Sequence, residues 1–189
     1  LIGHNTDGIG FFKSLETLRA FHVRNNRLTI LGGGGASTAI IAQAAIDGAK
    51  EITIFCRPQS VERTVAIVQT IAQTTGVSLQ VLPNNDSQLL AEHINNSDLL
   101  INGTSVGMDG TSLPLPATIR FPEELLVADV IYQPFETPLL KMANSQGNPT
   151  INGLGMLLFQ AAEAFELWTG KEMPTDLIWQ LLVQKYDIK

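Results

Sequence analysis

Four consecutive glycines carry the clearest chemical signal in this sequence. In "LTILGGGGASTAI", Gly32, Gly34 and Ser37 occupy the positions of the G-x-G-x-x-G/A pattern, between an apolar run and an Ala- and Ile-rich run. The first glycine permits a tight turn, the second lets the backbone approach a pyrophosphate, and the small third residue keeps helix and strand close. Gly35 and Ala36 add free N–H groups at the helix start. The pattern predicts a dinucleotide site; the alternative is a turn that only reverses the chain.

The residues that follow the next predicted strand bear on which dinucleotide is bound. The chain reads "FCRPQ" at residues 55–59, without the acidic residue that accepts hydrogen bonds from the ribose hydroxyls of NAD. Arg57 can meet a 2′-phosphate and lie across adenine. We therefore expect NADP as the cofactor. NAD stays compatible with the sequence, and a solvated arginine at a strand end is the alternative reading of Arg57.

A carboxylate near the start of the sequence is a candidate for acid–base chemistry. Asp7, in "NTDGIGFF", comes immediately before an apolar helical pattern. Thr6 or Asp7 would also serve as an ordinary helix cap in that position. The two roles are compatible because a capping position holds a carboxylate rigidly, but an isolated carboxylate is a poor acid–base group near neutral pH without a neighbour.

Composition favours a compact protein that acts on small molecules. The 189 residues are 44% hydrophobic and carry a formal net charge of −6, which argues against disorder and against nucleic-acid binding. Cys56 has no partner for an internal disulfide, and neither a secretory signal nor a membrane-spanning run is visible, so we expect a cytoplasmic protein with no membrane contact. His4, His22 and His93 share no metal-ligand spacing, so no metal is expected.

The elements that must position these residues alternate between strands and helices. Apolar runs predict strands at residues 28–31, 51–55, 77–82, 98–102, 126–132 and 150–151. Helical patterns predict helices from residue 6 or 7 to about 25, and at 36–46, 60–75, 86–95, 138–146, 156–168 and 175–186. The first helix is expected to bury an apolar stripe of Ile9, Phe12, Leu15 and Leu18. Strands linked through helices need right-handed crossovers, so we expect a doubly wound, Rossmann-like α/β fold with a parallel sheet of about six strands.

Five motifs resemble, in order and spacing, those of the shikimate/quinate dehydrogenase family: "NTDGIGF", "LGGGGASTAI", "LLINGTSVGM", "ADVIYQPFETPLL" and "INGLGMLLFQAAEAFELWTGK". The resemblance covers essentially the whole chain, but only the C-terminal, cofactor-binding portion of the family's two-domain protein. It implies an NADP- or NAD-dependent oxidoreductase that interconverts shikimate and 3-dehydroshikimate, or quinate and 3-dehydroquinate, in aromatic amino acid metabolism. A non-catalytic dinucleotide-binding or redox-sensing module is the alternative function.

The resemblance also implies three residues at the substrate. Asp7 matches an Asp that handles the hydroxyl proton together with a lysine of the family's N-terminal domain, and no lysine of this chain lies in that lysine motif. Gln160 matches a substrate-contacting Gln, whose amide can bond ring hydroxyls both as donor and as acceptor. Tyr132 matches a Tyr near substrate and nicotinamide. Outside the family context, a solvated Gln and a half-buried aromatic residue at a strand end are the ordinary interpretations.

Further matches concern the cofactor. Thr104 and Met108, in "NGTSVGM", would flank the nicotinamide ribose and ring, although the Asn-Gly pair at 102–103 is also typical of a simple turn. The carbonyl of Gly153 would orient the nicotinamide carboxamide. Asn152 stands where the family usually has Asp.

We expect three segments along the chain: an interdomain linking helix at residues 1–25, the dinucleotide-binding Rossmann domain at 26–152, and C-terminal helices at 153–189 that complete the domain. These helices would face an N-terminal substrate domain expected upstream of Leu1, which is not an initiator Met. The sequence leaves the oligomeric state open, with a homodimer as one option.

Overall fold

A computed structural model describes residues 3–186 as alternating strands and helices. Most elements begin and end within two residues of their predicted positions. In chain order they are α1 (Asp7–Arg19), β1 (Arg27–Leu31), α2 (Gly35–Ile46), β2 (Glu51–Cys56), the 3-10 turn η1 (Pro58–Ser60), α3 (Val61–Thr75), β3 (Ser78–Pro83), α4 (Ser87–Asn95), β4 (Leu99–Asn102), β5 (Leu126–Asp129), α5 (Pro138–Ser145), β6 (Thr150–Ile151), α6 (Leu154–Thr169) and α7 (Thr175–Tyr186).

The six strands of the described residues form one sheet in the order β3-β2-β1-β4-β5-β6, and every neighbouring pair is parallel. Leu28 of β1 stands opposite Ile52 of β2 on one side and Leu99 of β4 on the other. The strand order therefore reverses between β1 and β4. In open α/β sheets, ligands collect beyond the carboxyl ends of the strands at this reversal. The predicted doubly wound, six-stranded parallel sheet is confirmed.

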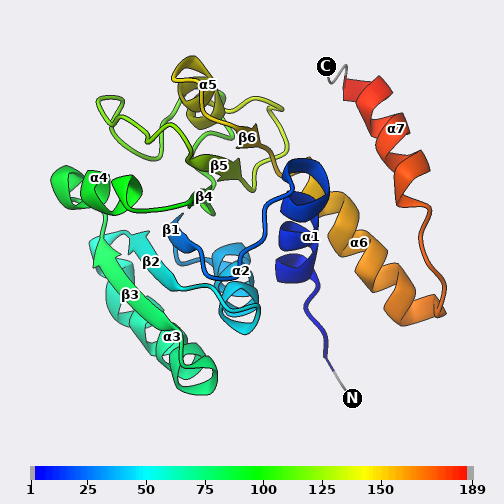
Figure 1. Ribbon diagram of the computed structural model, residues 1–189, viewed down its shortest axis with the longest axis horizontal. Helices are drawn as coiled ribbons and strands as arrows, with labels where there is room; N and C mark the ends of the chain where they lie inside the picture. The colour runs from blue at the N-terminus through cyan, green and yellow to red at the C-terminus, as the bar shows by residue number, and fades with distance from the viewer. Residues whose placement is uncertain (1–2, 187–189) are drawn as a thin grey trace.

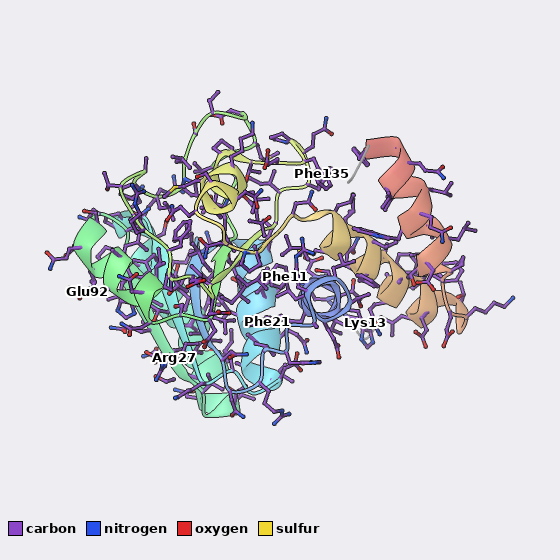
Figure 2. All side chains as sticks on the ribbon, turned by 45° about the horizontal axis from the view of Figure 1, so that its top comes forward. Phe11, Lys13, Phe21, Arg27, Glu92 and Phe135 are labelled. Atoms are coloured by element: carbon purple, nitrogen blue, oxygen red, sulfur yellow. The ribbon has the colours of Figure 1, made fainter. Side chains whose placement is uncertain are left out.

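Each face of the sheet has its own apolar core. Helices α1, α2, α3 and α6 share one core with the sheet, through residues such as Phe11, Ile40 and Met156. Helices α4 and α5 cover the other face, through residues such as Ile94 and Leu139. Figure 1 shows the arrangement, with α1 and α6 side by side on the side of the sheet away from β3 and α7 beyond them. In Figure 2, Phe11 lies on the sheet side of α1 and Lys13 on the side away from the sheet.

Helix α1 is shorter than its sequence pattern predicts. Phe12 and Leu15 of the predicted stripe are buried and Leu18 packs against the core, but the first turn of the helix differs from the prediction. The helix ends at Arg19 rather than near residue 25, because Ala20 takes a left-handed conformation with φ of 53°. The N–H of Ala20 donates to the carbonyls of Glu16 and Leu15 in the last turn of the helix. Ile9, predicted in the buried stripe, is 37% exposed. Gly8 and Gly10 are buried instead, each against a neighbouring helix. Close backbone contact, rather than apolar burial, sets the orientation of this first turn.

Strand β5 also ends early. It stops at Asp129, whereas the sequence predicts a strand as far as Tyr132. The Oδ1 atom of Asp129 accepts a hydrogen bond from the N–H of Ile131 at 3.0 Å, and this local bond takes that N–H out of the sheet ladder. Residues 130–132 therefore form a loop at the carboxyl edge of the sheet.

The C-terminal helices leave large apolar side chains exposed. Helix α7 buries none of its residues and packs mainly on α6 at the outer side of the molecule (Figure 1). Trp168 at the end of α6 is 84% exposed, and Leu177 and Leu181 of α7 are each 56% exposed. Even so, no helix within residues 3–186 is both long enough and apolar enough to cross a membrane.

Candidate active site

The glycine turn after β1 presents bare backbone to open space. Gly32 has a φ of +102°, a conformation that favours glycine, and a Cβ atom there would lie 2.7 Å from Thr104 Cγ2. Cβ atoms at Gly34 and Gly35 would meet no neighbouring atom within 4 Å. Gly34 precedes α2 in an extended conformation, so the first N–H groups of the helix, which have no partner inside it, lie at this opening. The turn can accept an anion at its backbone.

Ser37 holds the turn from behind. Its side chain is fully buried, and its hydroxyl donates a hydrogen bond to the carbonyl of Gly103 at 3.2 Å. A side chain at Gly103 would collide with Ser37. The small residue thus keeps α2 close to the end of β4, and its hydroxyl is engaged inside the protein.

A cavity of about 490 Å³ lies at the carboxyl ends of β1 to β4, where the strand order reverses. Gly32 to Gly34 line one wall and Thr104 another, and Asn84 lines the end beyond β3. Arg57 and Arg63 border the cavity, and among residues 3–186 none that lines it is acidic. A phosphate-bearing ligand therefore finds two cations and free backbone donors in one space.

The sequence did not identify Arg63. Pro58 begins the short turn η1, and Arg63 follows in the first turn of α3, six residues after Arg57. The available signal was a second arginine, close to a helix start, soon after the strand that Arg57 follows. Ser60, at the end of η1, also lines the cavity, and the sequence did not identify it either.

A second groove of about 450 Å³ connects the glycine turn to the start of α1. It is lined by Gly33 to Gly35 and Arg63 on one side, and by Asn5 and Gly8 on the other. Asn5 and Gly8 flank Asp7 in the sequence. The predicted acid–base residue thus begins its helix beside the predicted pyrophosphate turn.

Asp7 and Gln160 belong to elements that meet directly. Thr6, next to Asp7, donates a hydrogen bond from Oγ1 to Gln160 Oε1 at 3.5 Å, and a Cβ atom at Gly10 would lie 2.7 Å from Gln160 Cα. Thr6 occupies the N-cap position of α1, as one of the two predicted options, but within residues 3–186 neither its side chain nor that of Asp7 makes a capping hydrogen bond. It is Asn5 whose Oδ1 accepts from the N–H of Asp7 at 2.9 Å. Asp7 is half-buried, and its carboxylate accepts no hydrogen bond from residues 3–186, which leaves it available to a ligand.

Gly153 lies against the loop that carries Tyr132. Its N–H donates to the carbonyl of Ile131 at 3.0 Å, and a Cβ atom there would lie 2.5 Å from the carbonyl carbon of Val130. Tyr132, the next residue after Ile131, is 44% exposed. Met108 is 61% exposed and does not line the cavity beside Thr104. Asp7, Gln160, Tyr132 and Gly153 also lie outside that cavity wall.

Asn152, which departs from the family pattern, uses both ends of its amide. Its Nδ2 donates to the carbonyl of Phe135 at 3.0 Å, and its Oδ1 accepts from the N–H of Leu154 at 3.1 Å. A carboxylate could make only the second of these bonds. The amide therefore ties the start of α6 to the loop that follows β5.

A buried carboxylate lies just behind the cavity wall. Asp129 is 1% exposed, and burial raises the pKa of its carboxyl group while hydrogen bonds from Ile131, Thr137 and Asn102 oppose that rise. Sequence reasoning did not single out Asp129, because an aspartate at a strand end is an ordinary turn residue. Within residues 3–186, no group of three or more His, Cys, Asp or Glu side chains could hold a metal ion.

Comparison with known proteins places this site in context. Residues 153–183 match the family model of the shikimate 5′-dehydrogenase C-terminal domain. The chain is 81% identical over 189 residues to the shikimate dehydrogenase (NADP(+)) of Streptococcus suis strain 05ZYH33, covering 100% of this chain and 65% of that protein. It thus spans just under two thirds of the length of that relative.

Solved structures agree with the sequence comparison. The crystal structure of shikimate 5-dehydrogenase from Listeria monocytogenes, in complex with shikimate and NAD, superimposes with a TM-score of 0.89 at 42% identity, over 95% of this chain and 63% of that one. The enzyme from Thermus thermophilus, in complex with NADP(H) and shikimate, gives a TM-score of 0.74 at 32% identity, over 92% and 60% of the two chains.

Proposed function

Because this chain belongs to the shikimate/quinate dehydrogenase family, we propose that it is the nucleotide-binding part of an NADP-dependent enzyme that interconverts shikimate and 3-dehydroshikimate. The observation that carries the proposal is the groove that joins the glycine turn to the start of α1, where Asp7 stands beside the helix that bears Gln160. A dehydrogenase needs a nucleotide site and a proton-handling site next to each other, and this groove connects two candidates for them.

The residues around the cavity fit a dinucleotide phosphate. The backbone from Gly34 to Ser37 would hold the pyrophosphate, and Arg57 and Arg63 would pair with the 2′-phosphate. Thr104 would contact the nicotinamide half, and the nicotinamide, when bound, supplies the acceptor for hydride. NADP is named in the relative from Streptococcus suis, whereas the Listeria monocytogenes structure holds NAD, so NAD is the competing cofactor.

At the substrate, Asp7 would take the proton from the ring hydroxyl, and the Nε2 and Oε1 ends of the Gln160 amide would hydrogen-bond neighbouring hydroxyls. Tyr132, being exposed at the loop beside Gly153, would border the same site. The carbonyl of Gly153 would orient the nicotinamide carboxamide, with Met108 on the loop opposite. The lysine expected to share the proton with Asp7 would come from the substrate domain.

We further propose the division into a linking segment at 1–25, a nucleotide-binding domain at 26–152 and C-terminal helices at 153–189. The exposed apolar side chains Trp168, Leu177 and Leu181 support a partner surface on those helices, and the substrate domain is the occupant we propose. Quinate as substrate, a homodimer and a cytoplasmic location remain predictions from the sequence.

The decisive experiment is kinetic and uses the complete protein. Shikimate or quinate is supplied with NADP or NAD, and the absorbance of the reduced nicotinamide is followed. We expect the highest rate with shikimate and NADP. The Asp7→Asn variant should lose at least about a hundredfold in kcat, the scale of a lost proton-transfer group. Asp176→Asn is the matched control, since Asp176 also stands in the first turn of a helix, and its rate should equal that of the wild type.

The result also separates the enzyme from its alternative. A non-catalytic module would bind NADP through the glycine turn and the arginines but would turn over neither substrate. Turnover that survives Asp7→Asn unchanged would remove Asp7 from the mechanism.

A further inference from the structure

Asp129 sits at the carboxyl end of β5 with both carboxylate oxygens engaged by side chains and backbone. Oδ1 accepts from the N–H of Ile131 at 3.0 Å and from Asn102 Nδ2 at 3.1 Å. Oδ2 accepts from Thr137 Oγ1 at 2.7 Å and from the same Asn102 Nδ2 at 3.1 Å. A carboxylate 1% exposed is costly to bury and is tolerated only with such partners. All four hydrogen bonds come from the protein itself, from Asn102, Ile131 and Thr137.

The contact with Asn102 fixes which way that amide points. An asparagine side chain has a donor end and an acceptor end of nearly the same shape. Because Asp129 only accepts, it holds Nδ2 of Asn102 on its own side. Oδ1 of Asn102 is thereby directed to Thr104, where it accepts from the N–H at 3.1 Å and from the hydroxyl at 2.7 Å.

Thr104 in turn forms the wall of the nucleotide cavity. Its Oγ1 accepts from the N–H of Val106 at 3.1 Å, and Nδ2 of Asn102 donates to the carbonyl of Val106 at 3.1 Å, which closes the loop 102–106 on itself. On its other side, Thr104 Cγ2 packs against the space left by the missing side chain of Gly32. Thr104 and Val106 both line the cavity.

We propose that Asp129 is a positioning residue for the nicotinamide half of the cofactor, acting through the orientation of the Asn102 amide on the loop that carries Thr104. The inference rests on the proposed function. The effect should fall on the nicotinamide half, because the adenosine half would be held by Arg57 and Arg63, which line the same cavity but belong to the segment after β2. Within residues 3–186, the hydrogen bonds of the Asp129 carboxylate come from Asn102, Ile131 and Thr137, and none of these belongs to that segment.

The Asp129→Asn variant tests this with little change of volume. Asn102 Nδ2 contacts both carboxylate oxygens, so an amide at position 129 places an N–H donor against it in either orientation. Of the acceptors that now hold the Asn102 amide, the carbonyl of Val106 remains intact, and the preference of that amide for its present orientation weakens. When that amide reverses, its donor end faces the N–H of Thr104. Thr104 then loses both bonds to Asn102.

Two nucleotides separate the halves of the site. The complete protein is titrated calorimetrically with NADP and with adenosine 2′,5′-bisphosphate, which lacks the nicotinamide half. For Asp129→Asn we expect about tenfold weaker NADP binding, equivalent to about 1.4 kcal/mol, and unchanged bisphosphate binding. The control is Thr137→Val, which removes another partner of the same carboxylate and a cap of α5 but leaves the bond between Asp129 and Asn102. It should lower the melting temperature without changing either affinity.

The outcomes are distinguishable. Equal NADP affinity in wild type and Asp129→Asn overturns the inference while the proposed function stands. Equal losses of affinity for the two nucleotides overturn it as well, since the effect would then be a general loss of structure. Thr137→Val is the reference for this comparison, because it should lower the melting temperature while leaving both affinities unchanged. Failure of the wild type to bind either nucleotide would overturn the proposed function and the inference with it.

Discussion

Helices α1 and α6 touch through a glycine, and this contact links stability to the spacing of the proposed substrate site. A Cβ atom at Gly10 would lie 2.7 Å from both Cα and Cβ of Gln160 and nearer still to its backbone nitrogen. Reaching the 3.4–4 Å of ordinary contact requires the helices to separate by roughly 1 Å, because backbone atoms cannot rotate away. The substitution Gly10→Ala therefore moves the helix of Asp7 away from the helix of Gln160.

The expected cost of Gly10→Ala follows from two opposing effects. Overpacking against a backbone costs about 3 kcal/mol, at the upper end of the usual range. Alanine gains about 1 kcal/mol over glycine as a helix former. The net loss in free energy of unfolding should be about 2 kcal/mol, or a melting temperature lower by roughly 4–8 °C for a chain of this size. A displacement of about 1 Å between reacting groups costs on the order of a hundredfold in rate.

Urea unfolding and shikimate-dependent reduction of NADP by the complete protein measure the two effects. Gly3→Ala is the control, since a Cβ atom at Gly3 would meet nothing within 4 Å. It should change neither stability nor rate. If Gly10→Ala is as stable and as active as the wild type, the two helices are not in backbone contact, and Asp7 and Gln160 are not held together in one site by this contact.

The remaining predictions concern the two arginines, the buried carboxylate and the amide before Gly153. Replacing Arg57 or Arg63 by Ala should weaken NADP binding by about tenfold and NAD binding little, because a charge-assisted contact to the 2′-phosphate is lost; calorimetry with both nucleotides decides, and equal losses would refute the assignment. Burial raises the pKa of Asp129, so its contribution to stability is complete below about pH 3.9 and is lost as pH rises through the folded-state pKa. As the pH rises from acidic to neutral, the free energy of unfolding of the wild type, measured by urea titration, should therefore fall relative to that of Asp129→Asn. A difference between the two proteins that stays constant with pH would contradict this. Asn152→Asp should lower the melting temperature by about 2–4 °C, since one hydrogen bond worth about 1 kcal/mol is lost; an unchanged value would mean that the bond to the loop after β5 contributes nothing.

The architecture was predictable from the sequence because strand and helix periodicities are local. The alternation of apolar runs with helical patterns, punctuated by glycines such as Gly76 and Gly147, placed most element boundaries within two residues. Parallel pairing then followed from the crossover connections that such alternation requires. The glycine turn was also predictable, because its function depends on the backbone freedom of residues adjacent in sequence.

Element ends set by side-chain contacts were less predictable. Strand β5 stops at Asp129 because that carboxylate accepts the N–H of Ile131, and the apolar run through Tyr132 carries no trace of this bond. Helix α1 turns Gly8 and Gly10 inward because α2 and α6 approach them closely. A pattern of apolar residues cannot report that approach, since it is the absence of a side chain that permits it.

The sequence by itself determined the fold class, the position of the glycine turn and the identity of Asp7, Gln160 and Arg57 as candidates, because each is written in a local pattern or a motif. Only the tertiary structure brought Arg63 to the cavity, joined Thr6 to Gln160 across 154 positions, and set Asp129 behind Thr104. The physical reason is distance along the chain. Such contacts exist only after the sheet has brought the ends of separate strands to one edge, and no local pattern encodes the separation of two atoms from different elements.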